Sequence, residues 1–111
     1  MLAKLPNFGT IKTMQTVIET PTFAKQADKI WSEDERLNFI EYIVANPTVG
    51  DVIPHAEGAR KVRWSVKGQG KRGGVRVIYF NQDADGIIYL VSIYQKTEKS
   101  NITGKEIKNA I

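Results

Sequence analysis

Two β-type segments joined by one turn occupy residues 73–96, GGVRVIYFNQDADGIIYLVSIYQK. Residues 75–80 and 87–94 are rich in β-branched and aromatic side chains, which favour extended strands. The connection over residues 83–86 ends in Asp-Gly, a strong sequence signal for a hairpin turn. This stretch therefore predicts two adjacent antiparallel strands, around which the other segments are arranged.

A strand and a helix are predicted immediately upstream. Residues 14–19 are short and β-branched, as expected of a strand. Thr20 as the N-cap and Pro21 at the first helical position begin a helix that we expect to end near Trp31. The residues expected to form its buried side are Phe23, Ala27, Ile30 and Trp31.

A second helix is predicted from a capping box. The Ser32 hydroxyl can accept a hydrogen bond from the Glu35 amide, while the Glu35 carboxylate accepts one from the Ser32 amide. Asn46 and Pro47 end this helix, because proline disfavours the helical conformation of the residue before it. The two helices form a hairpin, and the apolar residues at helical spacing in the second are Leu37, Phe39, Ile40, Ile43 and Val44.

The remaining segments complete an α+β domain. After a loop around Gly50 and Pro54, residues 59–66 alternate basic with apolar side chains and predict a third antiparallel strand. Ile102 and Thr103 begin a short last helix. We expect a small antiparallel sheet, mixed at its N-terminal strand, with the helical hairpin packed on one face. Residues 1–13 are expected to be a flexible leader and residues 14–111 a single domain.

Positive charge is concentrated between residues 58 and 82. This segment has seven basic residues and no acidic one, while the rest of the chain has nine Lys or Arg against all twelve Asp and Glu. Such segregation creates a local positive field that attracts polyanions, above all a nucleic-acid backbone. The seven are Arg60, Lys61, Arg63, Lys67, Lys71, Arg72 and Arg76.

Several classes of site are excluded by the composition. With no cysteine and one histidine, His55, the chain has no thiolate metal site and no Ser/His/Asp set, so we expect no metal and no cofactor. Residues 68–73 match G-x-G-x-x-G, but they precede a strand and not a helix, so they are not a dinucleotide motif. The longest apolar run, residues 87–94, is too short to span a membrane.

A candidate site centres on Arg76, which lies inside an otherwise apolar strand. An arginine among residues destined for burial usually has a partner or a function. Tyr94 and Lys96 are two residues apart and point to one side of the sheet, and hairpin pairing can bring them alongside Arg76. Together with Lys71 they form a set suited to a phosphodiester. The plainer alternative is that these cations only solvate a sheet edge.

These residues resemble those of the RelE/ParE toxin superfamily, and most of all HigB-type toxins of bacterial toxin–antitoxin pairs. The likeness is carried by residues 58–64, 70–79 and 93–96, and it extends over about residues 14–107. It implies a RelE-like fold and an mRNA interferase, an endoribonuclease that inhibits translation by cutting mRNA in the A site of the small ribosomal subunit. It also implies a bacterial cytoplasmic location and a protein antitoxin, often one with a helix-turn-helix, through which alone the toxin would reach operator DNA.

The resemblance also assigns roles to individual positions. Arg76 would hold the scissile phosphate, and Lys71 would be the active-site lysine of the loop. Tyr94 and Lys96 would be the tyrosine and the basic residue near the end of the sheet. The residues expected to grip mRNA or ribosomal RNA are Arg60, Lys61, Arg63, Lys67 and Arg72.

The chemistry expected of such a site needs no metal. The ribose 2′-hydroxyl would attack the adjacent phosphate, and Arg76 and Lys71 would stabilise charge on the phosphoryl oxygens. Because neighbouring cations lower the pKa of a lysine, Lys71 or Lys96 could transfer the proton, with Tyr94 as a second candidate.

Three other functions stay open at the level of the sequence. One is a ParE-like inhibitor of DNA gyrase, which shares the fold but needs no cluster of phosphate-binding cations. Another is a non-catalytic RNA-binding module, in which the basic sheet only grips a backbone. The third is an inactivated toxin retained as a DNA-binding partner of its antitoxin.

Overall fold

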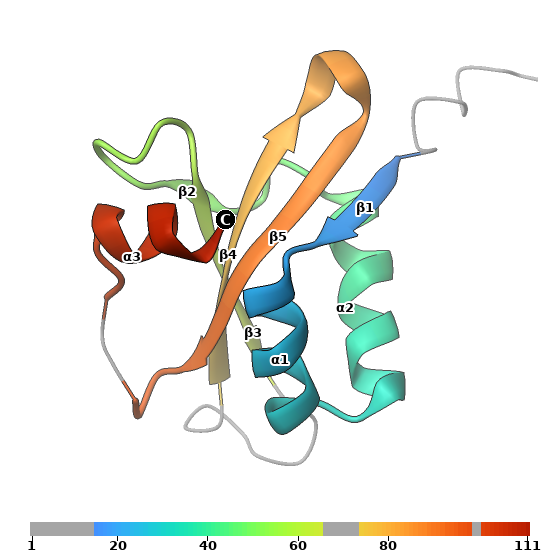
Figure 1. Ribbon diagram of the computed structural model, residues 1–111. Coiled ribbons are helices and arrows are strands. Elements are labelled where there is room, and N and C mark those ends of the chain that lie inside the picture. The colour runs from blue at the N-terminus through green and yellow to red at the C-terminus, as the bar shows by residue number, and fades with distance from the viewer. Residues whose placement is uncertain (1–14, 66–73, 99–100) are drawn as a thin grey trace, which may run out of the picture.

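The computed structural model describes residues 15–65, 74–98 and 101–111 of the 111-residue chain. These residues form one five-stranded sheet with helices on both of its faces (Figure 1). In chain order the elements are β1 (Thr16–Glu19), α1 (Pro21–Ile30), α2 (Glu33–Ala45), β2 (Asp51–Val52), β3 (Arg60–Ser65), β4 (Gly74–Gln82), β5 (Ile87–Gln95) and α3 (Gly104–Ala110).

The sheet has the strand order β1-β5-β4-β3-β2. β1 runs parallel to β5, whereas all other neighbours are antiparallel, so the predicted mixed sheet is confirmed. The predicted hairpin is β4 and β5, and its turn contains Gly86 with a φ of 65°. β2 was expected to be loop, because a two-residue strand has no periodicity in the sequence to reveal it.

The helical hairpin covers one face of the sheet, as predicted. Phe23, Phe39 and Ile43 from the two helices are fully buried against residues of β3, β4 and β5. Full burial of each such side chain stabilises the fold by roughly 1.5–3 kcal/mol. Of the apolar residues at helical spacing in α2, Leu37 is 53% exposed, because the inward side of the helix is set by Phe39 and Ile43, on its opposite side.

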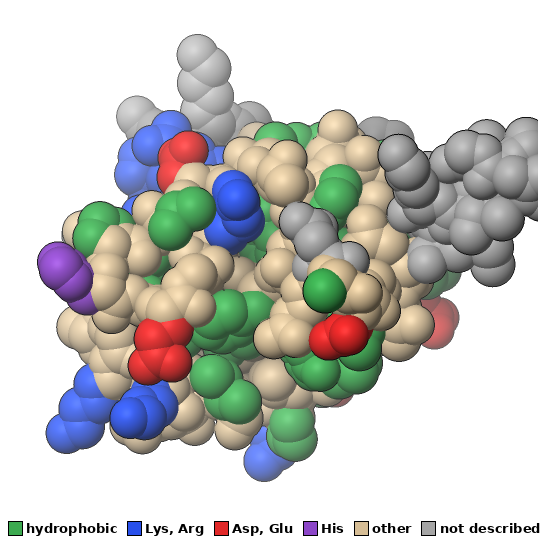
Figure 2. All heavy atoms as spheres, turned by 90° about the horizontal axis from the view of Figure 1, so that it is seen from above, with side chains coloured by type: hydrophobic (Ala, Val, Ile, Leu, Met, Phe, Trp, Pro, Cys, Tyr) green, Lys and Arg blue, Asp and Glu red, His purple; other side chains and the backbone are tan. Residues whose placement is uncertain are grey.

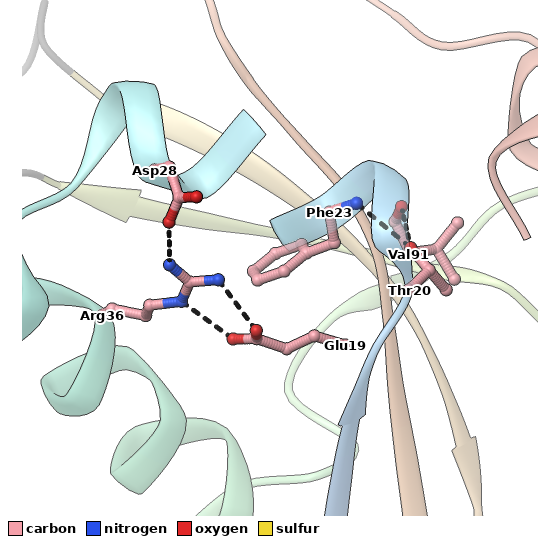
Figure 3. Close-up of polar contacts among 6 residues, drawn as sticks. All are labelled: Glu19, Thr20, Phe23, Asp28, Arg36 and Val91. Atoms are coloured by element: carbon pink, nitrogen blue, oxygen red, sulfur yellow. Dashed lines mark hydrogen bonds and ion pairs between the residues drawn. The ribbon is translucent and has the colours of Figure 1, made fainter. Parts of the chain in front are cut away.

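Side-chain hydrogen bonds fix both helices to the sheet. The Thr20 hydroxyl accepts a hydrogen bond from the Phe23 amide at 3.1 Å and donates one to the Val91 carbonyl at 3.0 Å, so it caps α1 and ties it to β5 (Figure 3). Arg36 of α2 donates through Nε and Nη2 to Glu19 of β1, at 2.9 and 2.8 Å, and through Nη1 to Asp28 of α1 at 2.7 Å (Figure 3). Both predicted caps, at Thr20 and at Ser32, are confirmed.

The opposite face of the sheet carries α3, which the sequence suggested as a helix but did not place. Thr103 and Glu106 form its capping box. Ile107 and Ala110 of α3 pack with Ile78 and Val91 of the sheet in a second apolar cluster. Seen from above, from the side of the β4–β5 turn, hydrophobic side chains occupy the middle of the surface and charged side chains lie around them (Figure 2). No helix in the described ranges is long and apolar enough to cross a bilayer.

Candidate nucleic-acid site

Arg63, Arg76 and Tyr94 form a row across three neighbouring strands. Arg76 of β4 lies directly opposite Arg63 of β3 on one side and Tyr94 of β5 on the other. Directly opposed residues of antiparallel strands project from the same face, with Cβ atoms about 4.5–5.5 Å apart. This is the face that carries α3, because Ile78, two residues after Arg76, packs in the α3 cluster.

Lys96 extends the same site at the end of β5. Its amide donates a hydrogen bond to the Gly74 carbonyl at 3.3 Å, so the strand pairing continues one residue beyond β5. Lys96 is the first residue of the turn that follows β5, directly beyond the pair of Gln95 and Val75. The structure therefore brings Arg76 and Tyr94 together on one face, and the exposed Lys96 lies two residues from Tyr94, just beyond the end of the strand.

Arg76 is buried, and it has no counter-ion among the described residues. The residue is 8% exposed, and within the part of the chain that the structure describes its side chain makes one hydrogen bond, from Nη1 to the carbonyl of its neighbour Val75, at a long 3.4 Å. Within residues 15–65, 74–98 and 101–111, both ion pairs belong to Arg36, and no carboxylate pairs with Arg76. A buried guanidinium without an anion is costly, so this position is ready to accept one.

Tyr94 is held in its protonated form beside Arg76. The residue is 3% exposed. Burial raises the pKa of the Tyr94 phenol, the positive charge of Arg76 opposes that rise, and the Glu106 carboxylate of α3 adds to it. With a pKa above its ordinary value of about 10, the hydroxyl keeps its proton at neutral pH and can donate a hydrogen bond.

The other predicted RNA-binding residues separate into three groups. Arg63 and Lys61 of β3 lie on the Arg76 face, and Lys61 Nζ donates to Asn101 Oδ1 at 3.2 Å. Arg60 lies on the opposite face, where its guanidinium has other contacts. Lys67, Lys71 and Arg72 lie outside the described residues.

Arg60 and Tyr79 hold the loop that follows α2. Arg60 Nη1 donates to the carbonyls of Thr48 and Gly50, at 3.1 and 2.7 Å. The buried Tyr79 hydroxyl accepts from the Gly50 amide and donates to the Pro47 carbonyl, both at 2.9 Å. Burial raises the pKa of Tyr79. The structure thus gives Arg60 a contact with the protein backbone, which alternation along β3 could not reveal because it says nothing of the loop.

Two residues near the site were not expected from the sequence, namely Asn101, which binds Lys61, and Glu106, which acts on Tyr94. Asn101 comes from the segment that leads into α3 and Glu106 from the first turn of α3 itself, and they act on residues of β3 and β5. No local pattern could have indicated them. Among the described residues, no three His, Cys, Asp or Glu side chains are grouped so as to hold a metal ion.

Three of the solved structures with a similar fold belong to one toxin–antitoxin system, that of E. coli RelE and RelB. A mutant of the E. coli toxin RelE in the free state has a TM-score of 0.57 and 11% identity, with 86% of this chain and 92% of that chain covered. The intact E. coli RelBE toxin–antitoxin complex gives a TM-score of 0.55 at 12% identity, over 73% of this chain and 95% of that chain. The RelE mutant in complex with an antitoxin RelBc peptide gives 0.53 at 12% identity, over 87% and 94%. At such low identity these likenesses establish the fold.

The family is established by the sequence itself. A family model described as the RelE toxin of the RelE/RelB toxin–antitoxin system matches residues 15–110, nearly the whole chain. This protein belongs to the RelE toxin family, the toxins of type II toxin–antitoxin systems that inhibit translation by cleaving mRNA.

Proposed function

We propose that this toxin is itself an endoribonuclease, which cuts mRNA in the A site of the translating ribosome without a metal ion. The observation that carries the proposal is Arg76: a buried guanidinium with no carboxylate partner among the described residues, flanked by Arg63 and Tyr94. A phosphate group would supply the missing anion. Arginine suits this role because its planar fork of N–H groups matches two phosphate oxygens at once.

The cleavage step needs one nucleophile and two proton transfers. The 2′-oxygen bonds to the adjacent phosphorus while the bond from phosphorus to the 5′-oxygen breaks, which gives a 2′,3′-cyclic phosphate and a free 5′-hydroxyl. One proton leaves the 2′-hydroxyl, and another is delivered to the 5′-oxygen. Negative charge grows on the phosphoryl oxygens in the transition state, where Arg76 stabilises it.

The remaining site residues take the supporting roles. We assign the two proton transfers to Lys71 and Lys96. Tyr94, which keeps its proton, donates a hydrogen bond to the phosphate held by Arg76. In line with the family, a protein antitoxin neutralises the toxin, and we propose that it carries a helix-turn-helix through which alone operator DNA is reached. The HigB-type subclass stays a prediction.

The grip on RNA comes from the exposed part of the same face. Arg63 and Lys61 continue the cationic row along β3, and Lys67 and Arg72 follow in the basic segment. Their contacts with phosphates would make binding fall steeply with salt concentration. Arg60 would have to release the carbonyls of Thr48 and Gly50 to reach RNA, so we assign it a smaller share.

The test is to induce the protein in bacteria and map the 5′ ends of transcripts, with and without translation. Wild-type protein should create new ends inside translated reading frames, and blocking translation should remove them. Arg76→Lys keeps the charge but loses the two-pronged contact, and should abolish cutting and toxicity while the circular dichroism spectrum is unchanged. Lys108→Ala, which removes a charge on the exposed side of α3, is the matched control. Growth arrest with DNA breaks and intact transcripts would instead indicate a gyrase inhibitor.

A further inference from the structure

A hollow of about 340 Å³ lies next to the cationic row, between β2 and the segment that leads into α3. Pockets for small ligands begin at about 300 Å³. Lys61 connects the two sites, because it is two residues from Arg63 on the same strand and face, or about 6.6 Å along the strand. The apolar wall of the hollow is Val52, Ile53, Pro54 and Ile102, and its polar groups are Asp51, Lys61 and Asn101.

Two of the polar residues of the hollow, Lys61 and Asn101, offer hydrogen-bond donors to a ligand. Lys61 Nζ donates to Asn101 Oδ1 at 3.2 Å, and an ammonium group can only donate. The amide oxygen of Asn101 must therefore face Lys61, which leaves the amide NH2 group for another partner. Neither that NH2 group nor the two other N–H bonds of Lys61 has a hydrogen bond within the described residues.

The third polar group is an acceptor. Asp51 of β2 lies directly opposite Lys61 of β3, so their side chains share a face, and the exposed Asp51 forms no ion pair in the part of the chain that the structure describes. A carboxylate here repels a phosphate but can accept a hydrogen bond from a neutral ring. The hollow thus suits a group that is flat, largely apolar and uncharged, with acceptors on one part of its edge and a donor on another.

We propose that this hollow binds a nucleobase of the RNA whose phosphate lies against Arg76, and that it prefers guanine. Guanine has the acceptors O6 and N7 together with the donor N2–H2, which match the donors of Lys61 and Asn101 and the acceptor of Asp51. The inference rests on the proposed function, because it needs RNA on the Arg76 face. It makes the pair of Lys61 and Asn101 a determinant of which sequences are cut.

The sharpest variant is Asn101→Asp. It keeps the shape of the side chain and the contact with Lys61, but it replaces the donating NH2 group by an accepting oxygen. The preference at one position beside the cut should fall about tenfold for guanine and move towards adenine and cytosine, whose amino groups donate. Asn109→Asp, the same substitution at an exposed position of α3, should leave the preference unchanged.

The measurement is a map of cut sites on a transcript library in which every base occurs around each codon. An enrichment of guanine at one fixed position that Asn101→Asp removes would support the inference. The same distribution for both proteins, or no base preference in wild type, would overturn it and leave the nuclease intact. If wild-type protein cuts nothing, the proposed function fails. Binding of 2′-O-methyl oligonucleotides that differ in one base then tests the hollow alone, and equal guanine preference in wild type and Asn101→Asp would refute it.

Discussion

Replacing Arg76 by methionine should make the folded protein more stable while removing its toxicity. The reason is the state of the guanidinium, which is 8% exposed and has one long hydrogen bond and no carboxylate partner among the described residues. Burying a charge without a partner costs several kcal/mol, even after the surroundings relax. Methionine is similar in length, apolar and adaptable in shape, so it fills the position without that cost.

The expected gain follows from the burial. Apolar replacements of buried charged groups are neutral or stabilising by about 1–4 kcal/mol, and the weak contact with the Val75 carbonyl is lost, so we expect a net gain of about 1–2 kcal/mol. Unfolding entropy of about 2.1 cal/mol/K per residue over 111 residues makes each kcal/mol equal to about 4 °C. The melting temperature should therefore rise by about 4–8 °C.

Urea and thermal unfolding of purified protein measure this gain. Arg63→Met is the matched control, because Arg63 lies opposite Arg76 on the same face but is exposed, and its replacement should change stability by no more than about 0.5 kcal/mol. Inorganic phosphate provides a second readout. At ten times its dissociation constant, an anion bound at Arg76 stabilises the wild type by about 1.4 kcal/mol, and it should not stabilise Arg76→Met.

One outcome would refute the reasoning. If Arg76→Met unfolds more easily than wild type by over about 1 kcal/mol, the guanidinium must be compensated within the free protein. Arg76 would then stabilise the fold of the free protein, and its face of the sheet would not be a phosphate-binding site.

Three further outcomes are expected from the described contacts. Tyr79→Phe should lower stability by about 2–4 kcal/mol in urea unfolding, because its buried hydroxyl bonds two backbone groups that would be left unpaired. At alkaline pH, Tyr79 and Tyr94 keep their protons in the folded protein after the unfolded chain begins to lose them near pH 10. Stability is then constant below that pH and falls above it, and Tyr94→Phe should reduce the slope by up to about 1.4 kcal/mol per pH unit. Glu19→Gln should lower the free energy of unfolding by about 1–2 kcal/mol, because it breaks the partly buried contact in which both Glu19 oxygens bind Arg36. Asp28→Asn should lower it by under about 0.5 kcal/mol, because Asp28 is exposed. A larger loss for Asp28→Asn than for Glu19→Gln would contradict this.

Most elements could be predicted because their determinants are local. The capping box of Ser32 and Glu35 lies within one helical turn, and the Asp-Gly turn lies between the two strands that it joins. Alternation along β4 also predicts that Arg76 shares a face with Ile78 and Phe80, and both of these pack in the α3 cluster. Helical spacing in α2 allows two overlapping apolar stripes, and only contact with the sheet shows that Phe39 and Ile43 are buried while Leu37 is exposed.

The sequence by itself determines the charge and the residue types of the candidate site. It contains a run of cationic residues without acidic ones, and an arginine within an apolar strand. Whether those cations meet is a matter of register between strands. The pairing of Arg76 with Arg63 and Tyr94 gathers them, while Arg60, three residues from Arg63, faces away and binds the loop after α2. The contact between Lys61 and Asn101 joins residues that are 40 positions apart, and the packing of Ile107 of α3 on Ile78 joins residues that are 29 positions apart. Such contacts form only when the whole sheet is assembled, because the periodicity of a strand specifies which side a residue takes and not which residue it will meet there.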